Sequence, residues 1–205
     1  MPETMVNRQR RSPQMPKGRL EAFSDGVIAI IITIMVLELK APHQPDLAAM
    51  RALIPAFLSY VLSFVYVGIY WNNHHHLFQV VKYVNGSTLW ANLHLLFWLS
   101  LFPFATAWIG ENHFAALPVA FYGVVLLLAA VAYFTLTRTL VLHHGEDSTL
   151  ATALGRDLKG KLSLMIYAAA VPLAFVNSWL ACALYILVAV MWLVPDRRIE
   201  KALST

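Results

Sequence analysis

Six apolar segments separated by short polar connectors run through this chain of 205 residues. They cover about residues 23–39, 54–71, 89–109, 117–137, 162–176 and 179–194. A helix that crosses a bilayer needs roughly 17 to 25 residues, so the last two segments lie at the short limit. Charged residues make up only 13% of the chain, about half the share found in soluble domains. The pattern predicts an all-α integral membrane protein with six transmembrane helices, the third kinked at Pro103.

The connectors predict the orientation and the domain boundaries. With the amino terminus inside, the inner segments hold thirteen of the 15 Lys and Arg residues, and the outer segments hold Lys40 and Arg51. This asymmetry places both termini in the cytoplasm, and it explains the net charge of +4 without a nucleic-acid partner. We expect a disordered basic cytoplasmic tail over 1–17, a six-helix transmembrane domain over 18–196 and a cytoplasmic tail over 197–205. Apolar residues near helical spacing predict a short interfacial helix within 148–161.

The first apolar segment carries a carboxylate, Asp25, about one turn inside its start. On a helical wheel with Ile30 at zero, Thr33, Ile34 and Leu37 fall between about −60° and +40°, whereas Asp25 falls near −140°. A carboxylate inside a span costs about 2.5 to 3.5 kcal/mol and usually faces protein or water. We therefore expect Asp25 to face neighbouring helices, and the aliphatic stripe to meet lipid or the same face of another subunit.

Polar residues at the same depth in the second and third segments are the candidate partners of Asp25. We predict a buried network of Asp, Ser, His, Asn and Trp side chains that fixes the first three helices in register. Proton sensing through His74 is a second interpretation, and Arg19 does not share the face of Asp25. The candidates are Trp71, Asn72, Asn73, His74, Asn92 and His94, and Ser24 is the serine of the network in the first segment.

The sequence gives no sign of a metal centre or of catalysis. His74, His75 and His76 are consecutive, so on a helix they point about 100° apart and do not converge on one ion. Zinc sites on helices use i, i+4 spacing, as in H-E-x-x-H, which is absent here. A nucleophile elbow, a Walker loop and G-x-G-x-x-G are also absent. We expect no enzyme activity, no metal site and no cofactor.

The segment "RLEAFSDGVIAI" carries the pattern R-x-x-x-F-S-D at Arg19, Phe23, Ser24 and Asp25. Together with "TIMVLELKAP", "YWNNHHHLF" and "LWANLHLLFWLSLFPF", it resembles the transmembrane protein 175 family. These proteins are the endosomal and lysosomal potassium channels and their prokaryotic relatives. The resemblance covers the first half of the chain, including Trp71, His74, Asn92 and Pro103, and the second half matches only as three further spans.

The resemblance implies a channel assembled from four copies, because this chain has the single six-helix repeat of the prokaryotic members. It implies that the first helix lines a central pore, with the constriction at Ile30 and further layers at Ile34 and Leu37. It also implies that Thr33 contributes to potassium preference. These are the residues of the stripe that the helical wheel isolates.

We therefore predict a potassium-permeable cation channel, weakly selective for potassium over sodium. A ring of isoleucines closes a pore by dewetting, which suits a gate better than a selectivity filter. The potassium-channel loop T-V-G-Y-G is absent. Glu38, near the outer mouth, either raises the local cation concentration or is an ordinary charge at a helix end. The expected partners are potassium ions, the lipid bilayer and further copies of the chain, in the plasma membrane of a prokaryote.

Three other functions are weighed against the channel. A proton-coupled secondary transporter using Asp25 and His74 is the main alternative, but the chain shows no internal repeat and no unwound Gly/Pro pair. An intramembrane enzyme fails on the histidine spacing. A non-conducting structural subunit is compatible with the sequence.

Overall fold

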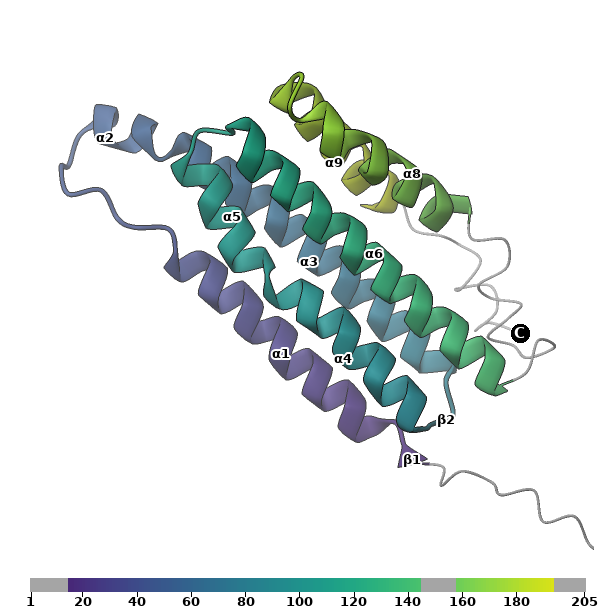
Figure 1. Ribbon diagram of the computed structural model, residues 1–205. Helices are drawn as coiled ribbons and strands as arrows, with labels where there is room; N and C mark the ends of the chain where they lie inside the picture. Colours follow the sequence, from purple (N-terminus) through teal and green to yellow (C-terminus); the bar gives the residue numbers. More distant parts are fainter. Residues whose placement is uncertain (1–14, 145–157, 194–205) are drawn as a thin grey trace, which may run out of the picture.

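Long helices run side by side in the computed structural model, which describes residues 15–144 and 158–193 (Figure 1). The first part of the chain forms α1 (Gly18–Leu37), the short α2 (Leu47–Ala52), α3 (Ile54–Val80), α4 (Gly86–Ser100), α5 (Phe102–Glu111) and α6 (Ala116–His144). α8 (Leu158–Leu173) and α9 (Ser178–Leu193) form a hairpin against α6 and α3. α1 lies at the opposite edge of the bundle, against α3, α4 and α5.

Four helical stretches are long and apolar enough to cross a membrane: α1, α3, α4 with α5, and α6. α8 and α9 have 16 residues each, which gives about 24 Å per helix at 1.5 Å per residue. The hydrocarbon core is about 30 Å thick, so these two helices are shorter than a typical span. The chain is therefore a mostly helical membrane protein with four clear spanning candidates and a shorter hairpin.

The observed helices differ from the predicted apolar segments in where they end and in a break within the third segment. α3 continues to Val80 and α6 to His144, each about two turns beyond the apolar run, because the polar residues there keep helical backbone. The third segment is broken at Leu101, just before Pro103, so that α4 and α5 are separate helices. A proline lacks the amide hydrogen that would continue the ladder, which accounts for the predicted kink.

Two short strands join the start of α1 to the connector after α3. β1 (Met15–Pro16) pairs antiparallel with β2 (Tyr83–Val84), and we call this the sheet end of the bundle. The Lys17 ammonium donates to the backbone oxygens of Phe78 and Gln79 at the end of α3. Residues 15–17 of the predicted 1–17 tail lie at this pairing. The rest of that tail, the predicted tail over 197–205 and most of the predicted 148–161 helix lie outside the described residues.

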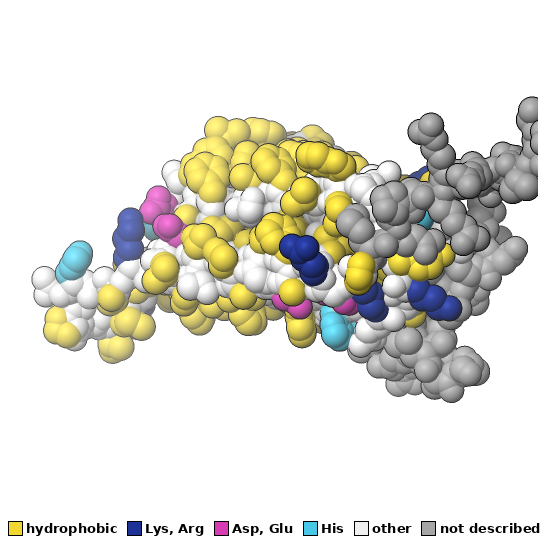
Figure 2. All heavy atoms as spheres, turned by 90° about the horizontal axis from the view of Figure 1, so that it is seen from below, with side chains coloured by type: hydrophobic (Ala, Val, Ile, Leu, Met, Phe, Trp, Pro, Cys, Tyr) yellow, Lys and Arg dark blue, Asp and Glu magenta, His cyan; other side chains and the backbone are white. Residues whose placement is uncertain are grey.

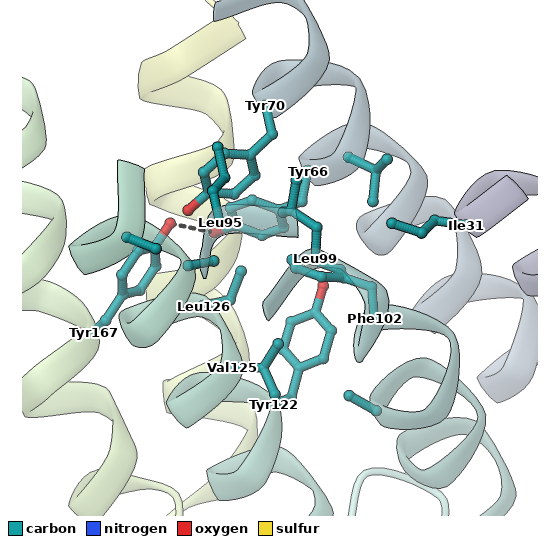
Figure 3. Packing of buried hydrophobic residues seen from close by; sticks show 14 of the residues in the cluster. Ile31, Tyr66, Tyr70, Leu95, Leu99, Phe102, Tyr122, Val125, Leu126 and Tyr167 are labelled. Carbon is teal, nitrogen blue, oxygen red and sulfur yellow. Dashed lines mark hydrogen bonds between the residues drawn. The ribbon is translucent and has the colours of Figure 1, made fainter. Parts of the chain in front are cut away.

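Tyrosine rings dominate the centre of the bundle (Figure 3). Tyr66, Tyr122 and Tyr185 are almost fully buried, and their rings lie within 6.5 Å of one another or of Phe102. Each hydroxyl is satisfied: Tyr66 donates to the backbone oxygen of Tyr185 at 2.5 Å, Tyr185 to Val119 at 3.2 Å, and Tyr122 pairs with Ser63 at 3.0 Å. Buried polar groups need such partners, so the rings fix how α3, α6 and α9 pack together.

Candidate functional site

One face of α1 is apolar and uncovered in the single chain. Ile30 is 59% exposed, Ile34 is 42% exposed and Leu37 is 73% exposed, and Phe23 continues the same line at 52%. Their spacing of three, four and seven residues places them along one side of the helix. Figure 2 views the molecule from the side on which α1 lies and shows hydrophobic side chains over much of that surface.

The opposite face of α1 is buried and determines the rotation of the helix. Its buried residues are Leu20, Ser24, Ile28, Ile31 and Met35. They span about 80° of the helical wheel, while the exposed positions span about 180°. About half of the circumference of α1 is thus exposed in the single chain. Exposed apolar surface of this extent marks an interaction surface in a soluble protein, and in a membrane it meets lipid or another subunit.

Thr33 is exposed between Ile30 and Leu37, where the wheel predicts it. Its hydroxyl donates a hydrogen bond of 2.9 Å to the backbone oxygen of Ala29. This bond uses the hydrogen and leaves a lone pair of the hydroxyl oxygen free to accept a hydrogen bond or approach a cation.

Asp25 lies at the edge of the exposed arc and is itself exposed. The Trp71 indole donates a hydrogen bond of 3.0 Å to its carboxylate. Trp71 is also 44% exposed, and its ring stacks on His75 with centroids 5.7 Å apart. The pair therefore links α1 to α3 at the rim of their contact rather than inside it.

A separate polar trio is fully enclosed between α1, α3 and α4. The Asn92 amide donates to the Ser24 hydroxyl at 2.9 Å, and its oxygen pairs with His74 Nε2 at 2.9 Å. All three side chains are at most 2% exposed. His74, rather than His75 or His76, is thus the histidine that enters the buried contact.

The predicted single network is divided in two. Ser24, Asn92 and His74 come together, Asp25 and Trp71 form their own pair, and the two groups share no hydrogen bond among the described residues.

The remaining candidates lie apart from both groups. Arg19, Phe23 and Glu38 are exposed, and Arg19 and Glu38 form no ion pair with the described residues. His94 accepts from Trp98 on its own helix, and Gln79 bonds both His75 and His76.

Sequence reasoning missed a second polar contact, nearer the α2 end of the bundle. The Thr106 hydroxyl lies 2.6 Å from Ser63 Oγ, which in turn pairs with the Tyr122 hydroxyl. Thr106 also lies 4.0 Å from the sulfur of Met35, so this chain reaches α1. Hydroxyl residues inside apolar segments were the available signal, because they need partners when buried.

Metal ligands are not grouped in the described parts of the chain, where no three His, Cys, Asp or Glu side chains lie close enough to hold an ion. The histidines near residue 75 are instead used by hydrogen bonds and ring stacking.

Comparison with known proteins links this arrangement to one family. Residues 19–103 match the family model described as endosomal/lysosomal potassium channel TMEM175. A potassium channel of Chryseobacterium sp. (strain P1-3) is 57% identical over 190 residues, which cover 93% of this chain and 99% of that protein. The crystal structure of a lysosomal potassium-selective channel TMEM175 homolog from Chamaesiphon minutus superposes with a TM-score of 0.75 at 29% identity, covering 87% of this chain and 96% of that one. The mouse endosomal/lysosomal proton channel TMEM175 is 30% identical over 179 residues, or 78% of this chain and 36% of that protein.

Proposed function

The chain belongs to the TMEM175 family of channels, and from this premise we propose that it is a potassium-permeable cation channel, weakly selective for potassium over sodium. We propose further that it acts as a homotetramer, with α1 of each copy lining a central pore. Its relatives are channels, which are not enzymes. The proposed setting is the plasma membrane of a prokaryote, with both termini cytoplasmic and α8 and α9 completing six crossings.

The exposed face of α1 is the observation that carries the proposal. A helix face that contacts only lipid needs no hydroxyl or small residue, but Thr33 and Gly26 interrupt the aliphatic residues of this face. A pore lining accommodates such residues. Four copies placed around an axis bring their Ile30 side chains into one ring. The buried face of α1 holds that ring in position against the rest of each subunit.

The gate in this proposal is the Ile30 ring, with Ile34 and Leu37 as further layers toward the α2 end. A narrow ring of aliphatic side chains excludes water, and an ion cannot cross a dry constriction with its hydration shell. Conduction therefore needs either a wider ring or a more polar one.

Selectivity in this proposal is modest and depends on Thr33. Its hydroxyl oxygen is the side-chain oxygen of the exposed stripe, and it can replace part of a hydration shell only at one level of the pore. Glu38 lies at the C-terminal cap of α1, where a carboxylate raises the local concentration of cations.

The transporter alternative is not favoured. It needs Asp25 and His74 to exchange a proton, but Asp25 bonds to Trp71 while His74 bonds to Asn92. The relatives reported above are described as channels.

Ion flux into liposomes tests the proposal. The purified protein is reconstituted, and a voltage-sensitive dye reports flux first under a potassium gradient and then under an equal sodium gradient. We expect flux in both, larger in potassium. In Ile30→Asn we expect potassium flux to rise about tenfold, which corresponds to a barrier lower by about 1.4 kcal/mol.

Val36→Asn is the matched control for the pore assignment. Val36 is 46% exposed on the same helix but lies about 120° around it from Ile30. We expect its flux to stay near that of the wild type. Equal increases in both variants would remove Ile30 from the pore, and unchanged flux in Ile30→Asn, Ile34→Asn and Leu37→Asn would refute the pore altogether.

A further inference from the structure

A small cavity lies on the far side of the bundle from α1, between α3, α6, α8 and α9. Its volume is about 40 Å³, room for about three water molecules. Figure 3 shows three of its residues, Tyr66, Tyr70 and Tyr167, with hydroxyl oxygens directed to one region. The aromatic residues of its wall are Tyr66, Tyr70, Tyr133, Phe134, Tyr167 and Trp192.

The Tyr70 hydroxyl in this cavity has no hydrogen-bond partner among the described residues, although the side chain is only 8% exposed. Its neighbours are all paired: Tyr167 donates to Tyr66 at 3.2 Å, and the Trp192 indole donates to Ser163 at 2.9 Å. Among the described side chains, the one fully buried polar atom without a partner is His143 Nε2, so the Tyr70 hydroxyl keeps some accessible surface. A hydroxyl without a partner is costly inside a membrane. Tyr70 is therefore a donor placed to meet a group that enters the cavity.

A groove continues from the cavity along the outer surface of α3. Cavity and groove share Ile69, Asn73 and Trp192. The groove has a volume of about 270 Å³ and passes over Gly68, where an added Cβ would meet no atom within 4 Å. Phe64 and Leu193 form apolar parts of its wall. This shape suits a hydrocarbon chain lying along the helix.

The charged residues that the structure describes on the helices around the cavity are basic. On the described residues of α3, α6, α8 and α9, the charged side chains are Arg138, Lys159 and Lys161, and none is acidic. The two lysines flank Gly160, which lines the cavity. Basic pockets between helices on the cytoplasmic side of a membrane bind anionic lipid head groups.

We propose that the cavity and its groove bind one anionic phospholipid from the leaflet at the sheet end. The phosphate lies near Lys159 and Lys161, an ester oxygen accepts the hydrogen bond from Tyr70, and one acyl chain follows the groove past Gly68. The site is remote from α1, so the proposal does not depend on the pore and its test needs no ion flux.

Native mass spectrometry of the purified full-length protein tests the site. The probes are palmitoyl-oleoyl phosphatidylglycerol and the phosphatidylcholine with the same chains, each added at increasing concentration. We expect one phosphatidylglycerol per chain to be retained at about tenfold lower concentration than phosphatidylcholine. Equal retention of the two lipids would overturn the proposal, because it would describe only a general lipid annulus.

Variants separate the three contacts. Tyr70→Phe keeps the ring and should weaken phosphatidylglycerol binding about fivefold through one lost hydrogen bond. Lys159→Gln with Lys161→Gln should remove the preference for the anionic head group. Gly68→Leu narrows the groove and should weaken binding of both lipids about tenfold; a Cβ at this position meets no atom within 4 Å.

Matched controls decide whether these effects are local. Tyr60→Phe removes a hydroxyl elsewhere on α3, Lys82→Gln removes a lysine near β2, and Ala168→Leu enlarges an exposed position of α8. All three should leave lipid retention unchanged. If Ala168→Leu lowers retention as much as Gly68→Leu, or Lys82→Gln as much as the double lysine variant, the site is refuted.

Discussion

Two adjacent side chains on α1 have opposite environments. Ser24 is fully buried with Asn92, whereas Asp25, one position later, is exposed with Trp71. Consecutive helical residues point about 100° apart, so both cannot enter one contact. The carboxylate, which is costlier to bury, takes the rim, and the neutral hydroxyl takes the interior.

Replacing Asn92 tests the importance of the buried trio. Asn92→Ala leaves Ser24 and His74 enclosed without their shared partner, and we expect the free energy of unfolding to fall by about 2 kcal/mol. Unfolding in mixed micelles by added dodecyl sulfate measures this. The exposed Asn112 donates one bond of 2.8 Å to Trp108, and Asn112→Ala should change stability by about 0.5 kcal/mol or less. Similar losses in the two variants would contradict an enclosed trio.

Thr33 can be tested by an isosteric change. Thr33→Val keeps the shape and removes the hydroxyl oxygen from the exposed stripe, so we expect the ratio of potassium to sodium flux to fall by about threefold, the effect of one modest polar contact. Total potassium flux should persist. Thr139→Val, on α6, removes a hydroxyl that also bonds to its own helix and should leave the ratio unchanged. A ratio unaffected by Thr33→Val would assign selectivity elsewhere.

The residue pattern of α1 could be predicted from its sequence, but the pairing of its polar groups could not. The stripe of Ile30, Ile34 and Leu37 follows from helical spacing alone, and the structure leaves these residues exposed. The partners of Ser24 and Asp25 depend on the rotation and height of α3 and α4, which packing over the whole bundle determines. The residues at the right depth were therefore found, while their division into two groups was not.

At the scale of helices, starts were predicted better than ends. The apolar segments at 54 and 117 begin within one residue of α3 and α6, because prolines mark the first turn of each. The helix ends were missed because hydropathy marks only the part of a helix that lies in the hydrocarbon core. Backbone hydrogen bonding continues the helix beyond it into polar sequence. The short α2 was missed because its six residues carry no periodic signal.

Close helix contact at Gly110 gives a test at this scale. A Cβ at Gly110 would lie 2.6 Å from the backbone Cα of Ala56 on α3. The backbone cannot rotate away as a side chain can, so Gly110→Ala should lower the free energy of unfolding by about 2 kcal/mol. Gly26→Ala is the control, since its Cβ would meet nothing within 4 Å. Equal stability of the two variants would show that α3 and α5 do not approach so closely.

For the whole molecule, the number of membrane crossings depends on whether the α8–α9 hairpin spans the bilayer. Its turn lies at the α2 end, where Trp179 stacks on Phe114 with centroids 5.1 Å apart. The basic connectors predict that this end faces outward, and six crossings require the hairpin to reach it. The sequence predicts the number of apolar segments, but their packing order and the edge position of α1 come from the structure.

Cysteine labelling tests this arrangement. In a Cys182→Ala background, which removes the buried native thiol, Val176→Cys places a thiol at the hairpin turn, where the residue is 83% exposed. We expect a membrane-impermeant maleimide added to intact cells to label Val176→Cys and His43→Cys. Lys82→Cys, at the sheet end, should label only after permeabilisation. Protection of Val176→Cys in intact cells would show that the hairpin does not cross.

The two ends of α1 are held by different contacts, although its buried face packs along the whole helix. Its first residues are tied down by the β1–β2 pairing and by Lys17 on the end of α3, whereas beyond Leu37 the described chain passes into a connector whose Lys40–Glu111 ion pair is exposed. This fixed end is the point about which α1 would tilt. A rotation of about 10° there displaces Ile30 by about 3 Å and Leu37 by about 5 Å, at 1.5 Å rise per residue. In the proposed pore, tilting of α1 about this end would therefore move Leu37 most, Ile30 less and Phe23 least.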